Sequence, residues 1–268
     1  AATQAAVASG WWSMGPRVAA FESEFAAHCG VAHALVVANG TAAIHMALAA
    51  TGIGPGDEVI VPSLTFVAAA NMVAAVGATP VFCDILGPHD LNLDVADVEA
   101  AITPATRAVM PVHYGGFPCD MDGLGALVGD AGLILSEDAA HAPGASFRGR
   151  RLGSIGAVGC FSFFSNKNLP VGEGGMVVTN DDAIAAQLRL LRSHGMTTLT
   201  WDRHRGHASG YDVLIHGFNY RLDELRAAIG SVQLSRLDAN NAARGRHAVH
   251  YRTLLSETCL IVVLGCLA

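Results

Sequence analysis

The chain is organised around the stretch CFSFFSNKNLPVGEGGM, residues 160–176. Lys167 stands there among apolar or small residues, and Gly172, Gly174 and Gly175 follow it. Glycines let a backbone bend tightly or pass close to a ligand. A lysine amine held among apolar groups loses solvation, which lowers its pKa and makes it a nucleophile of the kind that forms Schiff bases. A surface lysine in a glycine-rich hairpin is the alternative, and the local sequence favours neither.

Short apolar strands alternate with helices on both sides of this stretch. The spacing is that of βαβ units, so we expect an α/β fold with a mostly parallel sheet and helices on both faces. The polar, glycine-rich residues 194–216 are expected to form a mobile loop. The expected strands are 34–38, 58–61, 79–84, 108–114, 133–138 and 175–179. The expected helices are 16–30, 39–50, 95–102, 121–130, 182–193 and 222–237, with an alanine-rich helix after residue 66.

Composition excludes several classes of protein. Of the 268 residues, 51% are hydrophobic and 15% are charged, as in a densely packed globular protein. The net charge of -7 argues against a nucleic-acid partner, which would select a basic surface. No apolar run reaches the length of a membrane span, and residues 1–10 lack the basic flank of a secretory signal. The six cysteines are scattered without a C-x-x-C pair, which is typical of buried thiols in a reducing compartment, so we expect a cytoplasmic protein.

The residues Asn39-Gly40-Thr41-Ala42-Ala43 turn an apolar strand directly into a helix. A helix that begins this way presents free backbone N–H groups and the positive end of its dipole, which together favour a phosphate group. The Thr41 hydroxyl can add a further hydrogen bond. An ordinary helix start, capped by Asn39 or Thr41, is the alternative.

Asp138 ends the apolar strand 133–138, and His141 follows three residues later. Ligands of open α/β sheets bind at the carboxyl ends of the strands, where a carboxylate can hold the proton of a pyridine nitrogen. Phe66 follows another strand, and its ring can stack on a planar cofactor. In the structural alternative, Asp138 caps the next segment while His141 and Phe66 are core residues.

Large polar side chains precede the helix 222–237. Asn219, Tyr220 and Arg221 are placed to bind an anion or another subunit, or else they are exposed groups of a capped helix. Three histidines in the preceding loop, at 194, 204 and 207, raise the possibility of a metal site. Their spacing matches no standard ligand set, so we expect no metal.

Taken together, these segments resemble the DegT-like sugar aminotransferases, which use pyridoxal 5'-phosphate (PLP). The order and spacing of the matching segments agree across nearly the whole chain. The matching segments are GWWSMGP (10–16), NGTAA (39–43), GIGPGDEVIVP (52–62), Thr65-Phe66, PVHYGG (111–116), EDAAHA (137–142), the lysine stretch and NYRLDELRAAIG (219–230). The resemblance implies the large PLP-binding domain of the aspartate aminotransferase type of fold.

The resemblance also implies residue roles. Lys167 would form the Schiff base with PLP and then move the proton, and Asp138 would pair with the pyridine nitrogen. Phe66 would stack on the ring, and His141 would lie beside it. The phosphate-binding residues would be Gly40, Thr41, Ala42 and Ser162, with Asn219 reaching the phosphate of a neighbouring subunit in a homodimer. Trp11, Tyr220 and Arg221 would line the pocket of the nucleotide sugar.

The implied reaction moves an amino group from L-glutamate, or glutamine in some relatives, through the pyridoxamine form (PMP) to a keto group of a nucleotide-activated deoxysugar. Relatives that act as sugar dehydratases carry histidine at the position of Lys167, so the lysine argues against that alternative. A Rossmann-type dehydrogenase lacks support because no G-x-G-x-x-G follows the first strand. A non-catalytic paralogue that binds PLP or a partner protein remains a further alternative.

The sequence departs from the family pattern near its end. Family members continue into a smaller C-terminal domain, whereas residues 259–268 are apolar and do not resemble the start of that domain. We therefore expect a PLP-binding domain over residues 1–240, followed by the truncated start of a second domain over residues 241–268. Closure of such a domain over the substrate is in question for this chain.

Overall fold

The central sheet of the computed structural model, which describes residues 1–255, has seven strands in the order β1-β11-β10-β7-β6-β2-β3. Only β11 runs against its neighbours, so the sheet is mostly parallel, as the sequence predicts. Its strands are β1 (His33–Val37), β2 (Glu58–Pro62), β3 (Thr79–Cys83), β6 (Thr106–Val109), β7 (Ile134–Asp138), β10 (Val158–Ser162) and β11 (Gly175–Thr179). Two small hairpins pair β4 (Ile85–Gly87) with β5 (Asp90–Leu93), and β8 (Ser146–Phe147) with β9 (Arg150–Arg151).

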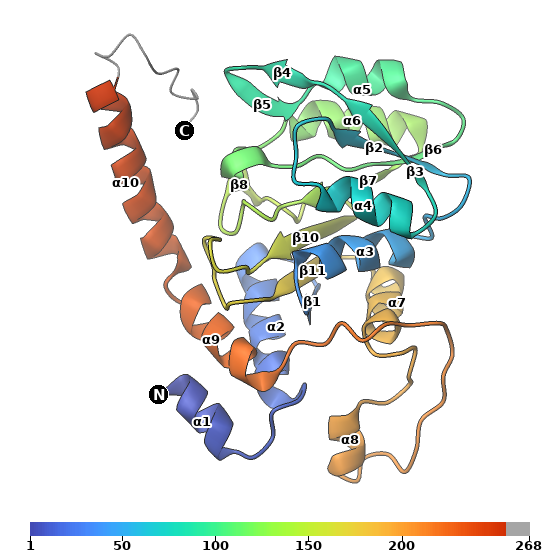
Figure 1. Ribbon diagram of the computed structural model, residues 1–268, viewed down its shortest axis with the longest axis vertical. Helices are drawn as coiled ribbons and strands as arrows, with labels where there is room; N and C mark the ends of the chain where they lie inside the picture. The colour runs from blue at the N-terminus through green and yellow to red at the C-terminus, as the bar shows by residue number, and fades with distance from the viewer. Residues whose placement is uncertain (256–268) are drawn as a thin grey trace.

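Helices cover both faces of the sheet (Figure 1). One face packs against α2, α5, α6 and α9, and the other packs against α3, α4 and α7. The helices are α1 (Ala2–Ala8), α2 (Pro16–Cys29), α3 (Gly40–Ala50), α4 (Ala68–Ala75), α5 (Val95–Ala101), α6 (Met121–Ala131), α7 (Asp182–Arg192), α8 (Thr200–His204), α9 (Glu224–Leu234) and α10 (Leu237–Leu255), with a 3-10 turn at Tyr114–Gly116. Alternate residues of a strand point to opposite faces, which explains why the wholly apolar strands feed two cores.

The structure corrects three expectations about the elements. The strand expected over 108–114 ends at Val109, because Pro111 has no N–H to continue the ladder. The single helix expected over 222–237 is two helices, and the hydroxyl of Ser235 donates to the carbonyl oxygen of Val232 (2.9 Å) where α9 ends. The loop expected over 194–216 contains α8, whose Trp201 packs against Trp11 with ring centroids 4.8 Å apart.

Helix α10 leaves the domain along one side (Figure 1). Its first turns are held by Asn241, whose side-chain amide donates to the carbonyl oxygen of Pro143 (2.9 Å), and Leu237 is its buried residue. The boundary expected at residue 240 falls inside this helix. The apolar segment 259–268 lies outside the described residues.

Helix α2 is capped from a distant part of the chain. Pro16 occupies its first turn, as expected from its fixed φ. The buried carboxylate of Glu224 accepts hydrogen bonds from the backbone N–H groups of Arg17 (3.0 Å) and Val18 (2.9 Å). A carboxylate in this position also interacts favourably with the helix dipole. The start of α9 thereby fixes the start of α2.

Replacing Glu224 with alanine is expected to lower the free energy of unfolding by about 2 kcal/mol, because two backbone donors lose their acceptor. Denaturant unfolding measures the change. The matched control is Glu24→Ala on the exposed side of α2, which is expected to change stability by less than about 0.5 kcal/mol. Equal unfolding midpoints for the two variants would contradict the capping role.

Candidate active site

The predicted residues that follow or end parallel strands lie at one edge of the sheet. Strands β1, β2, β7 and β10 run in the same direction, so their carboxyl ends meet at this edge. Strand β11 runs the opposite way and begins there. A methyl group built at Gly175 would lie 2.5 Å from the carbonyl oxygen of Asn39, so only glycine allows β11 to approach the turn after β1 this closely. The glycines after Lys167 thus bring the lysine stretch to the start of α3.

The start of α3 offers two backbone donors. The side chain of Asn39 caps the helix by accepting a hydrogen bond from the N–H of Ala42 (2.8 Å). The N–H groups of Gly40 and Thr41 have no acceptor within residues 1–255. A methyl group at Gly40 would lie 2.8 Å from the Cβ of Ser162, so the end of β10 packs directly against this turn. Free N–H groups beside a hydroxyl at a helix start form an anion site.

Lys167 lies on the loop after β10 and is half-buried. Its backbone N–H donates to the carbonyl oxygen of Phe164 (2.9 Å), which fixes the turn that carries it. Burial lowers the pKa of the amine, and the charge of Asp138 partly opposes that shift. Lys167 is also the only lysine in the sequence. Any side-chain amine chemistry of this protein therefore belongs to this residue.

Asp138 ends β7 as a buried carboxyl group that is 6% exposed. Its Oδ1 accepts a hydrogen bond from the N–H of Ala140 (3.0 Å), and no described residue donates to Oδ2. Burial raises the pKa of Asp138, and the Ala140 N–H and the charge of Lys167 oppose that rise. The carboxylate would be stabilised by a further cationic or N–H partner at Oδ2.

His141 lies near Lys167 as a half-buried ring. Its Nδ1 accepts a hydrogen bond from the N–H of Gly115 (3.3 Å). Burial lowers the pKa of His141, and the charge of Lys167 lowers it further. The neutral ring therefore carries its proton on Nε2, where it can donate.

Phe66 and Asn219 are exposed. The Phe66 side chain follows the end of β2 and is 71% exposed, so it is a free aromatic surface rather than a core residue. Asn219 lies in the segment before α9, where its backbone pairs with Ser193. Both side chains are free to contact a ligand or a second protein chain.

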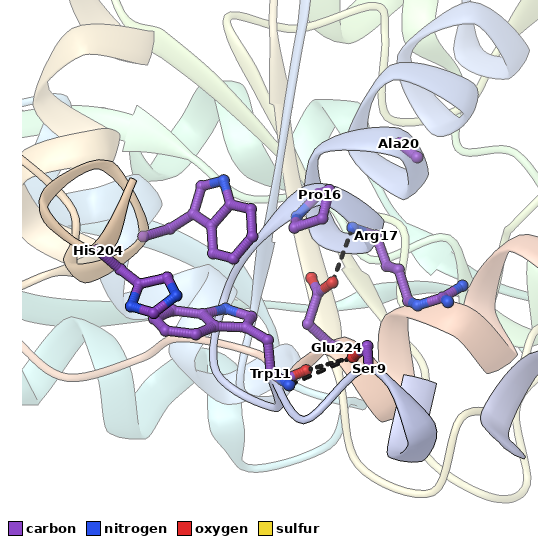
Figure 2. A pocket seen from close by; sticks show the side chains of 8 residues that line it. Ser9, Trp11, Pro16, Arg17, Ala20, His204 and Glu224 are labelled. Atoms are coloured by element: carbon purple, nitrogen blue, oxygen red, sulfur yellow. Dashed lines mark hydrogen bonds between the residues drawn. The ribbon is translucent and has the colours of Figure 1, made fainter. Parts of the chain in front are cut away.

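Trp11 lines a different cavity, with a volume of about 460 Å³ (Figure 2). Its ring packs against Trp201, and its ring centroid lies 4.7 Å from that of His204. Of the other residues expected to bind the sugar nucleotide, neither Tyr220 nor Arg221 lines it. The lining residues are Ser9, Trp11, Pro16, Arg17, Ala20, Trp201, His204 and Glu224.

Tyr220 lies against α3. Its hydroxyl is 3.0 Å from Nδ1 of His45, and its ring stacks on Phe218 with centroids 5.1 Å apart. Arg221 is half-buried, and its pKa is lowered by burial and by the charges of Arg192 and Arg203. A guanidinium with cationic neighbours favours an anionic ligand.

Two buried residues beside the site were not predicted from the sequence. His113 and Glu137 form a hydrogen-bonded pair directly behind Asp138, with both side chains 0% exposed. The sequence does show Glu137 as a second acidic residue beside Asp138 at a strand end. The groups that bond to Glu137 come from distant segments, so the sequence does not reveal the pair. Across residues 1–255, the structure shows neither a cluster of metal-ligating side chains nor a helix suited to crossing a membrane.

A model of the DegT/DnrJ/EryC1/StrS aminotransferase family matches residues 1–265. The chain belongs to this family. The resemblance inferred from the sequence is thereby confirmed, and with it the PLP-dependent transferase type of fold. The enzymes of the DegT family use PLP as their cofactor.

Two curated relatives carry names that refer to a sugar synthase and to polysaccharide biosynthesis. GDP-perosamine synthase of Caulobacter vibrioides is 50% identical over 245 residues, which cover 91% of this chain and 63% of the relative. The spore coat polysaccharide biosynthesis protein SpsC of Bacillus subtilis is 47% identical over 93% of this chain and 64% of its own length. The chain thus spans less than two thirds of these relatives.

The solved structure of S. venezuelae DesV, in complex with a ketimine intermediate, has a similar fold. It superposes with a TM-score of 0.88 at 43% identity, over 96% of this chain and 66% of DesV. The residues described above fit PLP: the free N–H groups at the start of α3 suit a phosphate, and the unpaired Oδ2 of Asp138 suits a pyridine nitrogen.

Proposed function

We propose that this chain is the PLP-binding part of an aminotransferase that moves an amino group from L-glutamate or L-glutamine to a keto group of a nucleotide-activated deoxysugar. The observation that carries the proposal is the position of Lys167. The only lysine of the sequence lies at the ligand-binding edge of the sheet, near enough for its charge to act on both Asp138 and His141. Amino transfer needs an amine at this place.

The cofactor's phosphate is bound by Gly40, Thr41 and Ser162 at the start of α3. Ala42 supports this site indirectly, because its N–H is used by the Asn39 cap. Oδ2 of Asp138 would accept a hydrogen bond from the protonated pyridine nitrogen and keep that nitrogen protonated, which would supply a partner for the buried carboxylate. Phe66 covers one face of the ring.

Bound PLP supplies an aldehyde that captures amines and a ring that stores electrons. Lys167 would hold the cofactor through Nζ, and its amine would move a proton between the substrate carbon and the cofactor. Its lowered pKa leaves more of the amine unprotonated than in an exposed lysine, as both tasks require. His141 donates from Nε2 to an oxygen of the ring or the substrate.

The acceptor is a nucleotide-activated keto sugar. The names of GDP-perosamine synthase and SpsC support this class of substrate. Arg221 suits the diphosphate because its charged neighbours favour an anion. Tyr220 offers aromatic surface to the remainder of the nucleotide sugar. Trp11 lines a separate cavity, so it is left out of this proposed site.

We propose that two copies of the chain form a homodimer with shared sites. The exposed side chain of Asn219 reaches the phosphate site of the neighbouring copy, and the exposed ring of Phe66 is covered in the assembly. Within the described part of the chain, the Asn219 side chain has no hydrogen-bond partner and the Phe66 ring is exposed, which supports the proposal.

The test is an absorbance spectrum of the purified chain with PLP, followed by borohydride reduction and peptide mapping. We expect a visible band, a reduced label on the peptide that contains Lys167, and loss of the band when L-glutamate is added. A label on the N-terminal amine alone would overturn the proposal. A label on Lys167 with no response to glutamate or glutamine would favour the non-catalytic PLP-binding alternative.

The rate of PLP capture is expected to rise with pH and to reach half its maximum below the pKa of about 10.4 of an ordinary lysine. The unprotonated amine reacts, and burial lowers the pKa of Lys167, so the reactive form is present at lower pH. Stopped-flow absorbance between pH 6 and 11 gives the midpoint. Nα-acetyl-lysine is the control, and equal midpoints for the control and the protein would contradict the prediction.

A further inference from the structure

A buried pair of side chains lies behind Asp138, on the opposite face of β7. Nε2 of His113 is 3.0 Å from Oε2 of Glu137, and both side chains are 0% exposed. The Glu137 carboxylate also accepts three backbone N–H groups from the turn that leads into β10. These donors are Gly153 (2.7 Å), Ile155 (2.6 Å) and Gly156 (2.6 Å).

The hydrogen bonds assign the protons of this pair. The N–H of Cys119 donates to Nδ1 of His113 (3.2 Å), so Nε2 carries the proton that is donated to Glu137. Burial opposes ionisation of Glu137, but the hydrogen bonds from His113 and from the backbone N–H groups of Gly156 and Gly153 outweigh it and lower its pKa. Glu137 is therefore a carboxylate whose four donors come from two segments, His113 and the turn before β10.

His113 also holds the backbone of Asp138. The backbone N–H of His113 donates to the carbonyl oxygen of Asp138 (3.1 Å), and the backbone N–H of Asp138 donates to the carbonyl oxygen of Pro111 (2.9 Å). Among residues 1–255, only the N–H of Ala140 donates a hydrogen bond to the carboxylate of Asp138. Its direction is therefore set chiefly by the backbone of Asp138, whose N–H and carbonyl oxygen are both bonded to the segment 111–113.

We propose that His113 and Glu137 are positioning residues for the cofactor carboxylate. They fix the end of β7 so that Asp138 points to the pyridine nitrogen. They also fix the turn before β10, the strand that leads to Ser162 and Lys167. A buried ionised group is weak as a source of stability, since apolar residues of similar volume serve as well, so geometry is the better account of this pair. The inference rests on the proposed pairing of Asp138 with PLP.

The test compares His113→Phe, which keeps a ring but loses the donor, with His113→Gln, whose amide can donate to Glu137. Val98→Ala, at a buried position on α5, is the control for lost stability alone. The readouts are the dissociation constant of PLP, the visible circular dichroism of the bound cofactor, and amide hydrogen exchange at Ala140 in the cofactor-free chain.

His113→Phe is expected to weaken PLP binding roughly tenfold or more, as for other residues that orient a ligand-binding side chain. It should also reduce the visible circular dichroism and speed exchange at Ala140. His113→Gln should restore all three toward wild-type values, and Val98→Ala should leave PLP binding within about threefold of wild type. If His113→Phe does not fold, His113→Ala takes its place.

The positioning role is overturned if the folded His113 variant binds PLP as the wild type does, if His113→Gln gives no recovery, or if Val98→Ala weakens binding equally. In each of these cases the wild type still forms its visible band on Lys167, so the proposed function stands. Failure of the wild type to form that band overturns the proposed function, and the positioning role with it.

Discussion

Replacing Lys167 with alanine is expected to lower the rate of amino transfer by roughly 10³- to 10⁴-fold, which corresponds to roughly 4–5 kcal/mol of barrier. The variant loses both the covalent link to the cofactor and the group that moves the proton. No other lysine in the sequence can take over either task. Single-turnover conversion of the cofactor by L-glutamate, followed by absorbance, measures the change.

Two variants isolate the chemistry of the amine. Lys167→Arg keeps the positive charge, but a guanidinium stays protonated, so we expect the same loss of rate. Asn166→Ala changes the exposed neighbouring residue and should leave the rate within about threefold of wild type. A Lys167→Ala chain that retains a tenth of the wild-type rate would remove Lys167 from the reaction.

Replacing Arg192 with methionine is expected to lower the free energy of unfolding by about 3–5 kcal/mol, because it leaves a partly buried carboxylate without its cation. Arg192 ends α7 with a side chain that is 5% exposed, and its guanidinium pairs with Glu22 of α2. The same Nη1 donates to the carbonyl oxygen of Val36 in β1 (2.9 Å), and the Val36 N–H donates to Glu22 (2.9 Å). The cluster thus fixes the strand that leads to the phosphate turn.

The control for Arg192 is Arg189→Met, at an exposed position on the same helix, which should change stability by less than about 0.5 kcal/mol. The double variant Glu22→Leu with Arg192→Met removes both charges, so it should recover part of the loss of the single variant. Denaturant unfolding compares the four chains. Similar midpoints for Arg192→Met and Arg189→Met would show that the buried pair does not stabilise the fold.

The predicted site residues that the structure brings together share one local feature. Lys167, Asp138, Phe66 and the turn at Gly40 all follow the end of a strand, and parallel strands carry their ends to one edge. The local pattern placed Asp138, Phe66 and the turn at Gly40 in this way, whereas β10, the strand before Lys167, was not among the expected strands. Trp11 differs, because its surroundings depend on Trp201, which is 190 positions away in the chain and lies where a loop was expected.

The sequence by itself determined the alternation of strands and helices, the mostly parallel sheet and the position of Asp138 at the end of a strand. These features depend on hydrophobic period and on turn residues, which are local. Only the tertiary structure decided which distant groups meet. It placed β11 between β1 and β10, closed α2 with Glu224, and surrounded Glu137 with donors from His113 and the turn before β10. Such contacts join segments far apart in the chain, so no short-range pattern encodes them.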